Sequence, residues 1–127
     1  GQKRHDEPKI LAAQEFIEKN PCVWIAINDI CEKVGLSRRT FERNFRRCTG
    51  NTVAEYIQRV KVEHAKKELE SSSKTINEII FSTGYNDVDA FRKIFKKYTH
   101  LTPVEYRRRY TSDRELPLVK MRQGEGE

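Results

Sequence analysis

Apolar residues recur at three- and four-residue spacings along most of the chain, a pattern typical of α-helices. The first helix is expected to begin at Pro8, because proline suits the first turn of a helix, and to end at Asn20-Pro21. Residues 1–7 are polar and are interpreted as a linker or tag remnant. The apolar segment 23–25 has no partner strand in the sequence, so we expect a loop packed on the core. The pattern predicts an all-α fold.

A short helix, a glycine turn and a basic helix are predicted in residues 27–49. The short helix has a poor N-cap residue, Ala26, and Gly35 marks its turn. In the basic helix the phenylalanines lie on one side, and arginines fill the other. Ser37 stands at its N-cap position and Gly50 just past its end. This order of elements is typical of a helix-turn-helix.

The chain contains this pattern twice. Residues from Ile76 onward repeat those from Ile27 onward, with one extra residue at the second turn. Both faces of the basic helix recur, because Phe41, Phe45, Arg43, Arg46 and Arg47 correspond to Phe91, Phe95, Lys93, Lys96 and Lys97. Two similar basic helices in one chain predict two readers of one long polymer.

The second copy differs from the first at three positions. Thr75 and Glu78 have the spacing of a capping box, which the first copy lacks. Ile80 stands where close packing favours a small residue such as Cys31, so its packing should differ. His100 replaces the cap glycine, so the chain is expected to leave the second basic helix differently.

The longest predicted helix, residues 52–71, carries apolar side chains on two sides, so it should pack on two sides and join the two copies. One stripe consists of Ala54, Ile57, Val62, Ala65 and Leu69, and the other of Val53, Tyr56 and Val60. We therefore divide the chain into a first helix-turn-helix subdomain (8–51), this linker helix (52–71), a second subdomain (72–110) and a flexible tail (111–127).

Composition and charge narrow the classes of function that the chain could have. The formal charge of +6 over 127 residues favours polyanionic partners, and no apolar run approaches the roughly 20 residues of a membrane span. Cys22, Cys31 and Cys48 lack zinc-finger spacing and are odd in number, which favours buried free thiols in a reducing cytoplasm. The histidines have no evident catalytic companions, and neither a phosphate loop nor metal-ligand spacing is present. We expect neither an enzyme nor a cofactor or metal site.

The second copy carries the most specific residues. They are Ile76-Asn77-Glu78-Ile79, Gly84-Tyr85, residues 91–97, Thr102-Pro103 and Tyr106-Arg107. With them the chain resembles the DNA-binding domain of the AraC/XylS family of bacterial transcription regulators, from about Pro8 to Tyr110. It departs from the family pattern at Ile80, Asp89 and His100. The resemblance implies seven helices, forming two helix-turn-helix subdomains joined by one long helix, and a role in transcription regulation.

The candidate DNA contacts lie on the two basic helices. Arginine pairs bidentately with guanine, glutamate can accept from cytosine, and valine can contact a thymine methyl. In the first copy the candidate base contacts are Arg38, Arg39, Glu42 and Arg43, and the resemblance implies Val88, Asp89, Arg92 and Lys93 in the second. Basic residues one turn further on should contact phosphates, namely Arg46, Arg47, Lys96 and Lys97.

The expected partner is double-stranded DNA with an asymmetric site, because the two readers differ in sequence. The readers should enter successive major grooves, about 34 Å apart, so that this segment can bind as a monomer. Glu63, Glu68 and Glu70 leave room for a contact with RNA polymerase, and a missing N-terminal domain would allow the full-length protein to dimerise. The alternatives are sequence-blind binding of polyanions and a protein-interaction module, and the choice between activation and repression stays open.

Overall fold

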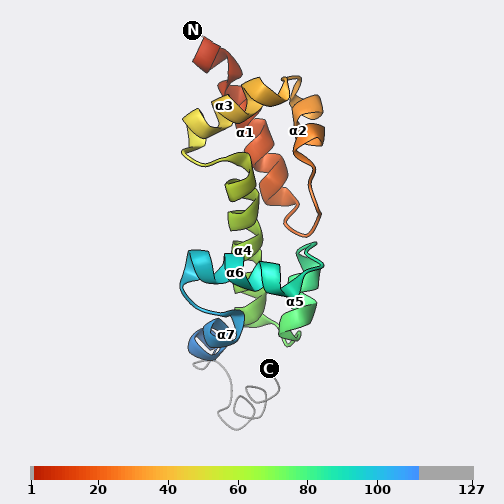
Figure 1. Cartoon of the computed structure of the whole chain (residues 1–127), viewed down its shortest axis with the longest axis vertical. Helices are drawn as coiled ribbons and strands as arrows, with labels where there is room; N and C mark the ends of the chain where they lie inside the picture. The colour runs from red at the N-terminus through yellow and green to blue at the C-terminus, as the bar shows by residue number, and fades with distance from the viewer. Residues whose placement is uncertain (1, 112–127) are drawn as a thin grey trace. The chain divides into compact units, whose positions relative to one another are not determined.

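The computed structural model describes residues 2–111, with side chains from Asp6 onward. This part of the chain is helical and contains no strand, as the apolar pattern predicted. Its seven helices are traced in Figure 1. They are α1 (Gln2–Lys19), α2 (Ile27–Val34), α3 (Arg38–Thr49), α4 (Val53–Ser71), α5 (Ile76–Ser82), α6 (Val88–Thr99) and α7 (Pro103–Thr111).

The chain forms two compact units that divide between Val60 and Lys61, within α4. The core of the first unit consists of Ile10, Ala13, Ile17, Ile30, Cys31, Phe41, Phe45 and Val53. The core of the second consists of Val62, Ala65, Leu69, Ile76, Ile79, Ile80, Phe91, Phe95 and Tyr106. Each core holds the two helices of one helix-turn-helix pattern.

The two apolar stripes predicted on α4 are partly wrong. Ile57 packs against the core of the first unit and not with Val62, and Ala54 is exposed. The side chains divide by their position along the helix: those up to Val60 pack in the first unit and those from Val62 in the second. Periodicity gives the direction of a side chain but not the point along a helix where its partner changes.

The predicted caps of the helix-turn-helix elements are confirmed. The Ser37 hydroxyl accepts the Thr40 N–H, and Thr75 and Glu78 form the capping box, whereas Ala26 provides no side-chain cap. Gly35 and Gly50 adopt left-handed conformations at the ends of α2 and α3, with φ of 76° and 78°. These local interactions satisfy backbone groups that a helix end leaves without partners.

The expected change of exit at His100 is wrong. His100 adopts φ 65°, and its N–H bonds to the carbonyl of Lys96 as that of Gly50 bonds to Arg46. The Thr99 hydroxyl bonds to the carbonyls of Phe95 and Leu101, and Thr49 makes the corresponding pair of bonds in the first unit. The threonine thus holds the same exit in both units, although a side chain in this conformation costs about 1 kcal/mol.

The first helix starts earlier than expected, since α1 begins at Gln2 and not at Pro8. Asp6 is buried and accepts a hydrogen bond of 2.6 Å from the Asn44 amide nitrogen on α3. This long-range bond gives the polar start of the chain a structural partner. The prediction for residues 23–25 is also partly wrong, because Ile25 packs on the core but Val23 and Trp24 are 52% and 66% exposed.

Two further predictions, for the cysteines and for the C-terminal segment, are only partly confirmed. All three thiols are free, but only Cys31 is buried, and Cys22 and Cys48 are exposed. Thr111, assigned to the flexible tail, lies in α7 and is buried. The rest of the predicted tail lies outside the described residues. None of the helices within residues 2–111 is long and apolar enough to cross a membrane.

Candidate nucleic-acid interface

Each basic helix has a buried aromatic back. Phe41 and Phe45 of α3 are fully buried, and so are Phe91 and Phe95 of α6. Phe45 contacts the Tyr56 ring edge-on at 5.3 Å between centroids, and Phe95 contacts Tyr106 in the same way at 5.6 Å. Burial of two phenylalanines on one side fixes the rotation of each helix about its axis, so the opposite side must face outward.

The candidate residues lie on the outward sides of α3 and α6. On α3 all six are exposed: Arg38, Arg39, Glu42, Arg43, Arg46 and Arg47. On α6 five are exposed, namely Asp89, Arg92, Lys93, Lys96 and Lys97, while Val88 is half-buried against the core of its unit. Eleven of the twelve side chains are thus accessible to a partner, and Val88 can offer only part of its surface.

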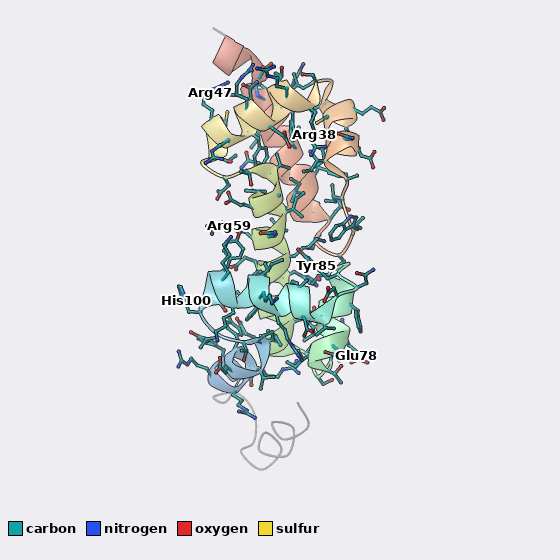
Figure 2. All side chains as sticks on the ribbon, viewed as in Figure 1. Arg38, Arg47, Arg59, Glu78, Tyr85 and His100 are labelled. Carbon is teal, nitrogen blue, oxygen red and sulfur yellow. The ribbon has the colours of Figure 1, made fainter. Side chains whose placement is uncertain are left out.

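Arg38 is held by two polar neighbours. Its Nε donates to Glu42 at 2.9 Å, and its Nη1 donates to the Asn28 side-chain oxygen on α2 at 2.8 Å. The Arg38 and Glu42 side chains are nevertheless about half exposed, at 49% and 46%. The pair therefore presents a guanidinium and a carboxylate fixed to each other, beside Arg39 and Arg43. Figure 2 places Arg38 and Arg47 on α3.

At the candidate base-contacting positions, the second unit has acidic and basic residues in the opposite order from the first. Asp89 and Arg92 stand where the first unit has Arg39 and Glu42, and Arg92 Nη1 lies 3.9 Å from the Asp89 carboxylate. Asp87 caps α6 by accepting the Ala90 N–H. Since acid and base exchange places, the two helices offer different donors and acceptors to the same kind of groove.

The turn before α6 packs on the core of its unit through Tyr85. Tyr85 packs edge-on against Phe91, with ring centroids 5.2 Å apart, and burial raises the pKa of its phenol. Gly84 has φ of 91°, a conformation that favours glycine. Figure 2 labels Tyr85 at this turn. The α6 N-terminus, which carries Val88 and Asp89, is therefore attached to the core through a defined turn.

Two polar residues were not predicted from the sequence. Asn28 is one: it accepts the hydrogen bond from Arg38, and the recurrence of asparagine at Asn77 in the second copy is a sequence signal for a structural role. Lys61 is the other: it is 1% exposed, although lysine side chains are mostly exposed in proteins. Within residues 2–111 no group of three or more histidine, cysteine, aspartate or glutamate side chains has an arrangement that could hold a metal ion.

Comparison with known proteins places this arrangement among transcription regulators. A family model described as a helix-turn-helix domain matches residues 30–109. The xylose operon regulatory protein of Escherichia coli K12 is 34% identical over 101 residues. The match covers 80% of this chain but only 26% of that regulator, so the chain spans about a quarter of the length of this relative.

Solved structures share the arrangement of helices. A transcriptional regulator from Chromobacterium violaceum, described as having an AraC-type DNA-binding domain, superposes with a TM-score of 0.75 and 26% identity, covering 90% of this chain and 98% of that one. The DNA-binding domain of AdpA, solved in complex with a target DNA, superposes with a TM-score of 0.77 and 24% identity, covering 83% and 95%. The second likeness concerns the fold alone.

Proposed function

Because the chain belongs to the AraC/XylS family of helix-turn-helix DNA-binding domains, we propose that it binds double-stranded DNA sequence-specifically through α3 and α6 and regulates transcription. The main support is the pair of capped helices with buried aromatic backs and exposed charged fronts. Each helix reads one major groove. The site is asymmetric, because α3 and α6 differ in their charged residues.

The contacts divide by chemistry. Arg39 and Arg43 pair with guanines, and the linked Arg38 and Glu42 read a neighbouring pair of bases. On α6, Arg92 and Lys93 donate to base acceptors, Asp89 accepts from cytosine and Val88 touches a thymine methyl. Arg46, Arg47, Lys96 and Lys97 bind phosphates and fix the register. Recognition and regulation, and not catalysis, are the activities that we assign to this segment.

We propose that the segment binds DNA as a monomer in the bacterial cytoplasm and that RNA polymerase is a further partner. Because the xylose operon relative is much longer, dimerisation and effector binding are assigned to parts of the protein outside this chain.

Selection of bound duplexes from a random pool tests the proposal directly. At physiological salt we expect an asymmetric consensus and binding at least about 10³-fold tighter than to scrambled duplex of equal length. Equal affinity for both would reject sequence-specific binding and favour the alternative, a sequence-blind binder of polyanions. Repeating the selection with Arg39→Ala and with Arg92→Ala assigns each base pair of the consensus to α3 or α6.

A further inference from the structure

Lys61 is a cationic side chain buried in the core of the second unit. It lies on α4 with 1% of its surface exposed, and Val62 and Ala65 on the same helix belong to the core of this unit. Its Nζ donates a hydrogen bond of 2.6 Å to the main-chain carbonyl of Thr83, which is fully buried. A buried ammonium group is unfavourable unless it is hydrogen-bonded, so this geometry ties α4 to the residue that ends α5.

The carbonyl that Lys61 binds belongs to the turn that differs between the two units. Three residues, 35–37, separate α2 from α3, whereas five, 83–87, separate α5 from α6. Gly35 ends α2 in a left-handed conformation, but Thr83 ends α5 with φ of −83°. The longer turn also has a left-handed glycine, Gly84 with φ of 91°, but this residue follows Thr83 and its N–H bonds three residues back to Phe81, whereas that of Gly35 bonds four residues back to Cys31. The two turns therefore end their first helices differently.

Most of the hydrogen bonds in this turn involve Thr83. Its N–H and its hydroxyl both bond to the carbonyl of Ile80, and the Gly84 N–H bonds to that of Phe81. The Thr83 carbonyl is the group that Lys61 holds. From this fixed point the chain passes through Tyr85, packed on Phe91, to Asp87, the N-cap of α6. Lys61 thus fixes the start of the segment that presents Val88 and Asp89.

The first unit uses the equivalent lysine differently. Ile10, Ala13, Ile17 and Glu18 of α1 correspond in spacing to Val62, Ala65, Leu69 and Glu70 of α4, and both glutamates accept a hydrogen bond from a tyrosine, Tyr56 or Tyr106. The same correspondence pairs Lys9 with Lys61. Lys9 is only half-buried and lines an open groove, beside a turn already capped by Gly35. A buried lysine therefore accompanies the longer turn and not the fold in general.

We propose that Lys61 is a positioning residue for DNA recognition by the second unit: its ammonium group, by holding the Thr83 carbonyl, sets the position of the α6 N-terminus in the major groove. The inference rests on the proposed function and concerns one of its two readers. Lys61 touches no base. Its loss should alter recognition by α6 and leave recognition by α3 unchanged.

The test uses Lys61→Met, which removes the ammonium group at similar length, and Lys61→Arg, which keeps a cationic donor. Lys67→Met is the matched control, because Lys67 is exposed on the same helix. Duplexes are drawn from the wild-type consensus, with single substitutions at base pairs assigned to α3 or to α6. Circular dichroism sets a temperature at which each variant is folded, so that simple loss of folded protein does not enter the comparison.

We expect Lys61→Met to bind the consensus about tenfold more weakly, as loss of a hydrogen bond to a charged group allows. Its discrimination should fall only at the base pairs assigned to α6, Lys61→Arg should restore most of it, and Lys67→Met should match the wild type. Equal losses at both sets of base pairs, or none at either, would overturn the proposal. If Lys61→Met does not fold, the test rests on Lys61→Arg. Loss of discrimination by Lys61→Arg at the α6 base pairs would overturn the role of the cation. A wild-type protein without any consensus would instead reject the proposed function.

Discussion

The two units pack a similar pair of helices, but the turn that joins the helices differs between them. In the first unit a left-handed glycine, Gly35, ends α2 and three residues lead to α3. In the second unit Thr83, held by the buried Lys61, ends α5 and five residues lead to α6. Both turns contain a left-handed glycine, Gly35 or Gly84, but the second turn is also held by a side chain from another helix. The comparison teaches that a duplicated pattern can keep its buried aromatic residues while its turn changes.

The two units also differ in where the corresponding lysine lies. Lys9, the counterpart of Lys61, lies at a groove of about 370 Å³ between α1 and α2, lined also by Phe16, Ile30 and Lys33. The Lys33 ammonium group lies 4.9 Å from the centre of the Phe16 ring, which keeps its charge at the surface. Lys9 and Lys33 thus remain near solvent in the first unit, whereas Lys61 is buried in the second.

The largest expected effect comes from the buried aromatic backs. Phe41→Ala and Phe91→Ala should each lower the free energy of unfolding by about 3–5 kcal/mol, because both side chains are fully buried. Since the units have separate cores, each variant should first lose the native amide signals of its own unit. Heteronuclear NMR during a urea titration measures this, and simultaneous loss of all signals in both variants would mean that the two cores unfold as one.

Arg43→Ala tests the assignment of base reading to α3. Loss of an exposed guanidinium should weaken binding to the selected site by about 1–3 kcal/mol and relax preference at one position. Fluorescence anisotropy on substituted duplexes measures both effects. Lys97→Ala is the control for phosphate contact. It should weaken all duplexes alike and reduce the slope of log affinity against log salt by about one unit. An unchanged dissociation constant for Arg43→Ala would remove Arg43 from the readers.

The tyrosine–glutamate bonds allow a comparison by pH. Tyr106 donates to Glu70, and burial followed by this bond raises the pKa of its phenol above the ordinary value of 10. A raised folded-state pKa means that the stabilisation is complete below pH 10 and is lost as pH rises through the folded value. Tyr106→Phe should lower stability by about 1–2 kcal/mol at neutral pH and reduce the loss above pH 10.

Tyr56→Phe is the matched variant in the first unit, where the Tyr56 phenol donates to Glu18 and its pKa is also raised, first by burial. Because Tyr106 is the more buried residue, its variant should show the larger effect. Thermal unfolding from pH 7 to pH 11 measures both. The opposite order would contradict the ranking of the two bonds.

The smallest expected effect concerns the C-cap residues of the two basic helices, Gly50 and His100. His100→Gly should raise stability by about 0.5–1 kcal/mol, since glycine adopts the left-handed conformation without strain. Gly50→His should lower it by a similar amount through backbone strain alone, because a Cβ at this position would meet no heavy atom within 4 Å. Denaturant midpoints measure the pair. Two changes of the same sign would show that the histidine ring makes a compensating contact.

Much of the fold and of the candidate interface follows from local patterns. The spacing of Phe41 and Phe45 predicts the buried side of α3, and with it the outward side that carries Arg39 and Arg43. Ser37 and the pair Thr75 and Glu78 predict helix starts because their partners lie three residues away. Whether the outward residues contact bases stays a prediction.

The sequence by itself determined most of the helices, their caps and the charged front of each basic helix, because these features depend on residues within one or two turns of each other. It also showed the duplication, as a match between two segments of the chain. Tertiary structure alone decided that Lys61 is buried and that Asp6 belongs to a helix held by Asn44. The physical reason is distance along the chain. The Thr83 carbonyl is 22 residues from Lys61, and Asn44 is 38 residues from Asp6, so no local pattern contains either partner.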